Sequence, residues 1–336
     1  MMIHRPDFIV IGAMKSATTT LHEQLARQPG LFMSRPKEPN FFSDDANYAR
    51  GWGWYGSLFR RANLGDLRGE ASTHYTKLPT YPRTVERMRH DLPRLKLIYV
   101  MRHPIDRLIS QYVHEVTVGR ITVGLLESLG SHPELIDYGR YSMQLKPYLE
   151  AYGFSSVLPV FFPRLVMHSQ AELERIGRFL GHDGPLRWDE TLEPQNRGSE
   201  RLRPSPVREV LVQSPVLTSI RRRVVPRRLS ECLKGFWRAR IEPPRLTPIL
   251  EARLREVFDA DLAQLGEWLG LRLDCENFHR ATVDLALEWV ASRDPTRRGR
   301  KPSSERTAGP NEGRLDDDRT PIRAVGRGMA RPRARP

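Results

Sequence analysis

A short segment near the start of the chain carries residue types that bind phosphate. Residues 7–21 read DFIVIGAMKSATTTL, an apolar run followed by a glycine turn, a lysine and a row of small and hydroxyl residues that leads into a helix. The first amides of a helix lack intrahelical acceptors and its dipole is positive there, so such a turn attracts anions. The pattern predicts an anion site, and a capped helix after an edge strand is the alternative. The residues concerned are Lys15, Ser16, Ala17, Thr18, Thr19 and Thr20.

This turn differs from the phosphate loop of nucleoside triphosphatases. That loop has the form GxxxxGK[ST], with a glycine before the lysine. Here Met14 precedes Lys15, and the lysine lies three residues after Gly12. The segment therefore predicts a related loop rather than that one.

A second candidate anion site follows another apolar run. Residues 95–111 read LKLIYVMRHPIDRLISQ, in which Arg102 ends a predicted strand and Ser110 lies about two turns into the next helix. An arginine repels a metal ion but grips phosphate with two parallel hydrogen bonds, whereas a kinase needs an aspartate for magnesium there. An ordinary ion pair between Arg102 and Asp106 is the alternative. Two phosphate sites without an obvious metal ligand indicate a nucleotide with phosphates at both ends of its ribose.

Three further segments complete a recognisable set. They are residues 37–42 (KEPNFF), residues 69–75 (GEASTHY) and residues 196–205 (NRGSERLRPS). Together with the two anion sites they resemble sulfotransferases that use 3′-phosphoadenosine 5′-phosphosulfate (PAPS), in the style of bacterial relatives of the heparan-sulfate and other carbohydrate sulfotransferases. The resemblance runs from about residue 4 to about residue 275.

The resemblance implies a role for each matched residue. The turn with Lys15 would hold the 5′-phosphosulfate, Arg102 and Ser110 would hold the 3′-phosphate, and Glu38 would be the base on the acceptor hydroxyl. One departure is Ala71, where many relatives carry a lysine, so one contact to the transferring group is missing or supplied elsewhere. The other implied site residues are Glu70, His74 and Tyr75 in the cleft, and Arg197 and Ser199 in a late loop over the nucleotide.

Some of these residues have other interpretations. Glu38 could be a solvated loop carboxylate, although its position between Lys37 and two phenylalanines favours a half-buried loop in which a carboxylate can act as a base. Glu70 is the rival base. His74 is interpreted as a structural residue of the cleft. No cluster of His, Cys, Asp and Glu has the spacing of metal ligands, so we expect no metal.

The elements that would position these residues alternate between strand and helix. We expect strands over residues 8–11, 31–33, 95–101 and 157–162, and helices over 17–27, 81–91, 105–118, 141–152, 171–180 and 247–269. Alternation of this kind predicts a single α/β domain with a P-loop-like central parallel sheet and helices on both faces. That domain would span residues 1–290, with a helical, arginine-rich segment at about 204–244.

The positive charge of the chain is concentrated near its end. The chain of 336 residues has a formal net charge of +14, an isoelectric point near 10.2 and only two cysteines. Residues 291–336 predict a disordered basic tail, since twelve Lys and Arg face six Asp and Glu from residue 294 onward. Much of the basicity therefore lies outside the predicted domain. No apolar run is long enough for a transmembrane helix, and a cytoplasmic enzyme is expected.

Three hypotheses follow. The first is a PAPS-dependent sulfotransferase acting on a small-molecule or glycan acceptor, with a sugar hydroxyl favoured by the resemblance. The second is a nucleotide kinase with a degenerate phosphate loop, which would need magnesium. The third is a basic nucleic-acid-binding protein, although no known reading module occurs and we expect no specific nucleic-acid partner. No feature indicates an oligomeric state.

Overall fold

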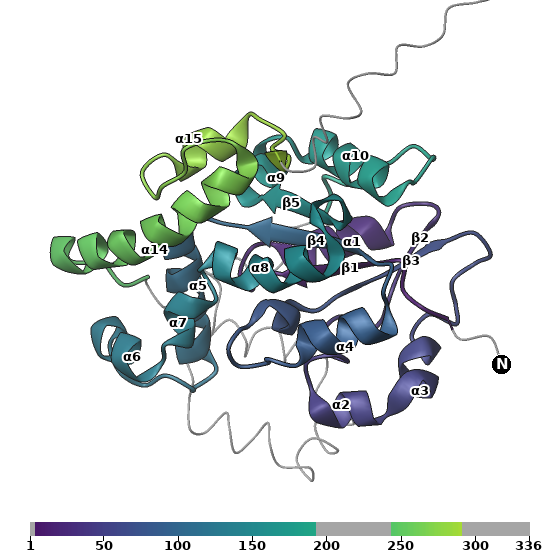
Figure 1. Ribbon diagram of the computed structural model, residues 1–336, viewed down its shortest axis with the longest axis horizontal. Helices are drawn as coiled ribbons and strands as arrows, with labels where there is room; N and C mark the ends of the chain where they lie inside the picture. Colours follow the sequence, from purple (N-terminus) through teal and green to yellow (C-terminus); the bar gives the residue numbers. More distant parts are fainter. Residues whose placement is uncertain (1–3, 193–242, 291–336) are drawn as a thin grey trace, which may run out of the picture. The chain divides into compact units, whose positions relative to one another are not determined.

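Five parallel strands form the sheet that carries the candidate residues (Figure 1). The computed structural model describes residues 4–192 and 243–290. The strand order is β2-β3-β1-β4-β5, so β1 lies in the middle. The strands are β1 (Phe8–Gly12), β2 (Leu31–Met33), β3 (Leu67–Ala71), β4 (Lys96–Met101) and β5 (Val157–Phe161).

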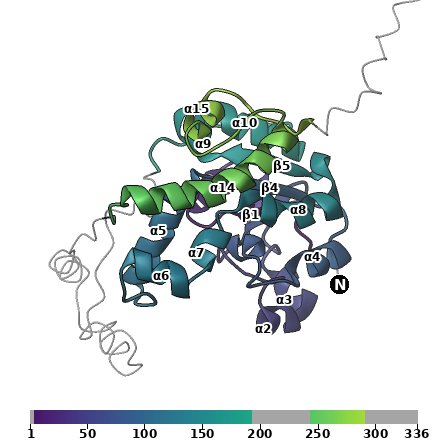
Figure 2. The same cartoon turned by 60° about the vertical axis from the view of Figure 1, so that its left-hand side comes forward.

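The central strands are buried on both faces, and their side chains divide between two cores. From β1, Ile9 and Ile11 enter one core, while Phe8 and Val10 enter the other. The first core lies under α4 (Thr84–Asp91), α5 (Pro104–Thr117), α8 (Tyr141–Tyr152) and α14 (Pro248–Leu269). The second lies under α1 (Thr18–Ala26) and α10 (Ser169–Leu180). In Figures 1 and 2, α14 runs across α5 and α8.

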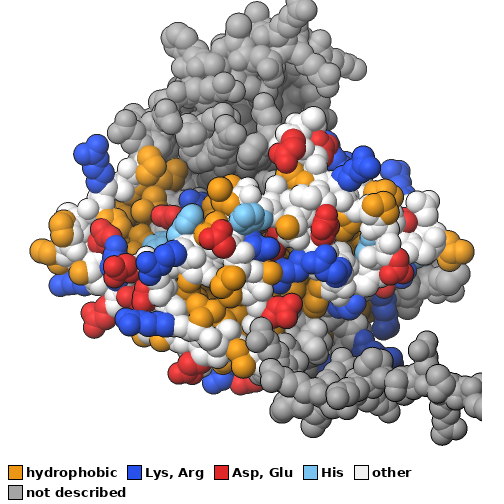
Figure 3. Space-filling view, turned by 90° about the horizontal axis from the view of Figure 1, so that it is seen from above, with side chains coloured by type: hydrophobic (Ala, Val, Ile, Leu, Met, Phe, Trp, Pro, Cys, Tyr) orange, Lys and Arg blue, Asp and Glu red, His pale blue; other side chains and the backbone are white. Residues whose placement is uncertain are grey.

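Short helices fill the connections between these elements. They are α2 (Asp45–Ala49), α3 (Gly51–Ser57), η1 (Thr73–Thr76), α6 (Leu125–Ser131), α7 (Glu134–Asp137), η2 (Phe154–Ser156), α9 (Phe162–Met167) and α15 (Phe278–Val283). None of the described helices is long and apolar enough to cross a membrane. On the face shown in Figure 3, positive and negative side chains are interspersed among hydrophobic ones.

The predicted α/β fold with a parallel sheet between two helical layers is confirmed. Strand β3 was not predicted, because Arg68, Gly69 and Glu70 interrupt any apolar run. Gly69 is required there, since a Cβ atom would lie 2.2 Å from the ring of Phe8. The predicted tail, and all but the last two residues of the predicted segment 204–244, lie outside the described residues.

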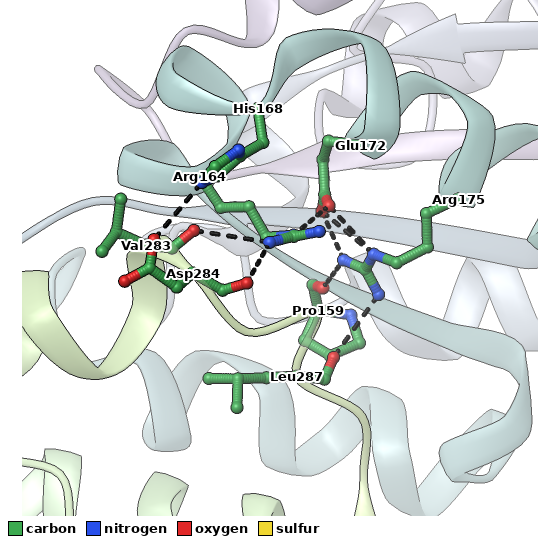
Figure 4. A network of polar contacts seen from close by, with 8 residues as sticks. All are labelled: Pro159, Arg164, His168, Glu172, Arg175, Val283, Asp284 and Leu287. Atoms are coloured by element: carbon green, nitrogen blue, oxygen red, sulfur yellow. Dashed lines mark hydrogen bonds and ion pairs between the residues drawn. The ribbon is translucent and has the colours of Figure 1, made fainter.

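The chain after α15 covers the outer edge of the sheet at β5. The indole of Trp289 donates a hydrogen bond to the carbonyl of Val157 at 2.6 Å. Figure 4 shows Arg164 of α9 and Arg175 of α10 converging on Glu172, whose side chain is fully buried. Arg175 also donates to the carbonyls of Pro159 and Leu287. This network joins α9, α10 and the C-terminal segment to the edge strand.

Candidate active site

The strand order places the candidate segments in one row. Because all five strands are parallel, the segments that follow them emerge at the same edge of the sheet. In spatial order, Glu38 follows β2, Thr73 follows β3, the loop 13–17 follows β1, Arg102 follows β4 and Phe162 follows β5. The candidate base therefore lies on one side of the anion-binding loop and the arginine on the other.

The loop after β1 is shaped by close contacts and by left-handed backbone. A Cβ atom on Gly12 would lie 2.0 Å from the hydroxyl of Thr76, so only glycine fits. Lys15 and Ala17 have φ values of 70° and 63°, which turn the chain sharply into α1. The amide of Ala13 donates to the carbonyl of Val100 at 2.8 Å, which ties the loop to β4.

The start of α1 has the donors that an anion needs. Ala17 is the N-cap residue and has no side-chain oxygen, so no side chain caps the amides of the first turn. Ser16 is fully buried, and its hydroxyl has no hydrogen-bond partner of normal geometry among the described residues. Thr18 is buried, whereas Lys15, Ala17, Thr19 and Thr20 are partly exposed. A buried hydroxyl beside uncapped amides fits a phosphate or sulfate group.

Arg102 is held by its backbone and by its side chain. The hydroxyl of Tyr141 accepts from the amide of Arg102 at 3.1 Å and donates to its carbonyl. The guanidinium carbon lies 5.0 Å from the ring centre of Phe162, a cation–π contact. No ion pair joins Arg102 to Asp106 within the described ranges, and the Nε of Arg102 is buried without a partner. Ser110, further along α5, is partly exposed.

The carboxylate of Glu38 is positioned from two sides. It accepts from the amide of Thr73 at 3.0 Å and from the Thr73 hydroxyl at 3.2 Å, and it forms an ion pair with Lys37 at 2.5 Å. The amide of Glu38 donates to the carbonyl of Ala71 at 3.0 Å. The side chain is 30% exposed. Glu38 therefore lies in a half-buried loop and reaches solvent.

Glu70 has a different environment. It is fully buried in β3, and its carboxyl accepts from the hydroxyls of Tyr55 and Tyr75, both at 2.7 Å, and of Ser72 at 2.8 Å. Burial raises the pKa of Glu70 to about 7. Tyr75 is itself 1% exposed. Glu70 and Tyr75, expected to line the cleft, are thus buried inside the protein and do not reach solvent.

Two basic residues, His74 and Lys77, follow β3 near the charge of Glu38. His74 stacks on Tyr81 with ring centres 4.8 Å apart, and burial lowers its pKa to about 4, so it is neutral near pH 7. Lys77, which the sequence did not single out, lies over the ring of Tyr138 at 5.6 Å, and burial lowers its pKa to about 8. Arg197 and Ser199 lie outside the described residues.

Sequence reasoning missed the residues that hold others in place. Thr73 orients Glu38, Tyr141 clasps Arg102, and Phe162 supports its guanidinium. Tyr141 falls in the helix predicted over residues 141–152, a prediction that gives it no role at the site. A threonine or tyrosine that acts through one hydroxyl leaves no local sequence pattern, so only the tertiary structure reveals these roles.

The fold and the loop together define the class of protein. A glycine turn, a lysine and a helix after the central strand of a parallel sheet make this a P-loop-like α/β protein. Among the described residues no group of three or more His, Cys, Asp or Glu could hold a metal ion.

Comparison with known proteins gives the family. A family model of the sulfotransferase domain matches residues 5–266, and the chain belongs to this family. It is 31% identical over 188 residues to mouse heparan sulfate glucosamine 3-O-sulfotransferase 3B1, covering 52% of this chain and 46% of that protein. It is 29% identical over 207 residues to human bifunctional heparan sulfate N-deacetylase/N-sulfotransferase 2, covering 56% and 23%. The chain thus spans half or less of the length of these curated relatives.

A solved structure has the same fold. A sulfotransferase from Alicyclobacillus acidocaldarius superposes with a TM-score of 0.55 at 22% identity, over 81% of this chain and 98% of that one. At this identity the likeness concerns the arrangement of the sheet and helices.

Proposed function

We propose that this protein transfers a sulfuryl group from PAPS to a hydroxyl of a carbohydrate or glycosylated acceptor. One observation carries the proposal: two sites suited to anions lie at the ends of adjacent strands. Gly12 of β1 pairs with Tyr99 of β4, so the loop 13–17 and Arg102 leave the sheet side by side. A nucleotide with a 5′-phosphosulfate and a 3′-phosphate has charges at both of its ends, which these two sites match.

The unpaired polar atoms support this fit. Among the described residues, the buried Nε of Arg102 has no partner and the buried Ser16 hydroxyl has none of normal geometry, although buried polar groups are normally hydrogen-bonded. One belongs to the proposed phosphosulfate site and the other to the proposed 3′-phosphate site. Ser110 of α5 would add a hydroxyl to the second site.

In the proposed reaction Glu38 accepts the proton of the acceptor hydroxyl while that oxygen forms a bond to sulfur. The bond between sulfur and the bridging phosphate oxygen breaks, and adenosine 3′,5′-bisphosphate leaves with the bonding electrons. Lys15 and the amides at the start of α1 stabilise the negative charge that grows on the leaving phosphate. Such groups act mainly by position and charge, and one of them is typically worth on the order of a hundredfold in rate.

The contacts of the two carboxylates favour Glu38 over Glu70 as the base. Glu38 is partly exposed at the edge of the sheet, where an acceptor can reach it, and Thr73 fixes its direction. Glu70 is inaccessible and bonded by three hydroxyls. We assign Glu70 to the support of the site.

The carbohydrate acceptor is proposed from the relatives. The matched proteins are named for heparan sulfate, and the family model, which covers residues 5–266, includes the proposed donor site. His74, which lies near the charge of Glu38, and Tyr81, on which it stacks, are aromatic side chains of the kind that can contact a sugar ring.

Calorimetry with adenosine 3′,5′-bisphosphate, adenosine 5′-phosphate and ATP tests the donor. We expect tight binding of the bisphosphate and much weaker binding of the other two, unchanged by excess EDTA. A kinase would instead prefer ATP and need magnesium for transfer. Equal affinity for the bisphosphate and the 5′-phosphate would refute the proposed 3′-phosphate site.

A further inference from the structure

Arg107 of α5 carries a buried charge that no carboxylate neutralises within residues 4–192 and 243–290. Its side chain is 0% exposed. Its two terminal nitrogens donate to the amide oxygen of Gln111 at 2.6 Å and to the carbonyl of Leu135 at 2.5 Å. The Nε has no partner. Both acceptors are neutral, so the positive charge stays uncompensated in a medium of low dielectric constant.

Elsewhere the same protein pairs its buried arginines with an acid. Arg175 is 6% exposed, and its guanidinium contacts the carboxylate of Glu172 at 2.5 and 3.1 Å. Arg164 meets the same carboxylate at 3.0 Å (Figure 4). Leaving a buried charge unpaired is strongly unfavourable, so the arrangement around Arg107 needs a physical reason.

No carboxylate is among the groups that act most strongly on the charge of Arg107. The ionisable groups that act most strongly on it are Tyr141, Tyr99, Tyr138 and Arg102. Burial raises the pKa of each of these tyrosines, so all three are neutral near pH 7. Arg102 is a second cation. None of these strongest neighbours is an anion, so an anion bound near Arg107 would meet a charge that no described residue pairs directly.

Its position on α5 links Arg107 to the proposed 3′-phosphate site. Arg107 is in the first turns of α5, where its amide bonds to the carbonyl of His103 at 2.9 Å, and Ser110 is three residues further on. Tyr141 is linked to both arginines, since its hydroxyl bonds to the backbone of Arg102 and the charge of Arg107 lowers its pKa, against the larger raising effect of burial. Arg107 thus lies between Arg102 and Ser110 along the chain, and its charge and that of Arg102 influence each other.

We propose that Arg107 provides a second, through-space positive charge for the 3′-phosphate site, and that the nucleotide's 3′-phosphate is the anion that balances it. This inference rests on the proposed function. Arg102 touches the phosphate directly, whereas Arg107 acts at a distance through protein of low dielectric constant, where one unit charge retains a strong effect. Removing the charge weakens binding of the 3′-phosphate and leaves the rest of the nucleotide site unchanged.

The test compares two ligands on four proteins. Calorimetry at pH 6.5 gives Kd for adenosine 3′,5′-bisphosphate and for adenosine 5′-phosphate with the wild type, Arg107→Gln, Arg107→Met and Arg107→Lys. We expect Arg107→Gln and Arg107→Met to reduce the preference for the bisphosphate by on the order of tenfold, and Arg107→Lys to keep most of it. The acidic pH helps a buried lysine to stay protonated. Arg68→Gln removes an arginine that pairs with Asp7 at the opposite end of β3, and this control should leave the ratio unchanged.

The ratio distinguishes the proposed role from a structural one. If Arg107 serves only to pack the protein, its substitution changes the Kd of both ligands by the same factor, and the ratio of the two Kd values stays the same. The inference is overturned if folded Arg107→Gln keeps the wild-type ratio, or if Arg107→Lys loses as much as Arg107→Gln. If the wild type shows no preference for the bisphosphate, the proposed donor site itself fails, and the inference falls with it.

Discussion

At the scale of single residues, two glutamates near the same strand ends differ in what surrounds them. Glu38 is held by an amide, a hydroxyl and an ammonium, yet it keeps an exposed edge. Glu70 is enclosed by Tyr55, Ser72 and Tyr75, whose hydroxyls all point at it. Accessible and oriented groups can exchange protons with a substrate, whereas an enclosed one can only support its neighbours.

Glu38→Gln tests this division directly. The amide oxygen can still accept from Thr73, so we expect normal folding and unchanged affinity for adenosine 3′,5′-bisphosphate. It cannot take a proton, so sulfuryl transfer from PAPS should fall by roughly a hundredfold or more in kcat. The control is Lys37→Met, which removes the ion pair but leaves the carboxylate. Transfer by Glu38→Gln at the wild-type rate would reject Glu38 as the base.

At the scale of elements, the C-terminal segment supports the strand ends from outside the sheet. The imidazole of His103, just before α5, lies 3.0 Å from the carbonyl of Cys275. Phe278 of α15 packs against His103 and against Phe161 at the end of β5. The position of the proposed 3′-phosphate site therefore depends on a part of the chain that is remote in sequence.

Glu172 is the central residue of the network that holds this segment, and its loss should be costly. Glu172→Gln leaves Arg164 and Arg175 without their carboxylate, so we expect a destabilisation of about 3 to 5 kcal/mol. Urea denaturation measures it. Glu174→Gln, on the exposed face of the same helix, is the matched control and should change stability by less than about 0.5 kcal/mol. A loss below about 1 kcal/mol for Glu172→Gln would contradict this account.

At the scale of the whole molecule, the buried carboxyl of Glu70 makes stability depend on pH. Its pKa is about 7 in the folded protein, against an ordinary value of 4.5. Between these values the folded state holds a proton that the unfolded state has released. Stability contributed by Glu70 therefore falls as the pH rises from about 4.5 to about 7 and changes little above that.

Glu70→Gln removes this dependence while it keeps a polar side chain. From pH 4.5 to 7.5 the wild type should lose about 3 kcal/mol of unfolding free energy relative to the variant. His74, whose lowered pKa has the opposite effect between about pH 4 and 6.5, is common to both proteins and cancels in the difference. Parallel stability curves for the two proteins would show that Glu70 does not titrate in this range.

The amino-acid sequence alone determined the local parts of this protein. The runs of residues 8–11 and 95–101 predicted β1 and β4, and Gly12, Lys15 and Arg102 predicted two anion sites at strand ends. These features are local, because an apolar run, a glycine turn and an arginine at the end of a strand are each recognised from a few neighbouring residues.

Only the tertiary structure decided which distant residues meet. The strand order inserts β3, a strand with a buried glutamate and no apolar run, between the segment of Glu38 and the loop of Lys15. It also places Tyr141 on Arg102 and leaves Arg107 buried without an acid among the described residues. Burial and hydrogen bonding depend on what the folded chain brings from elsewhere, and for that reason no local pattern could have shown them.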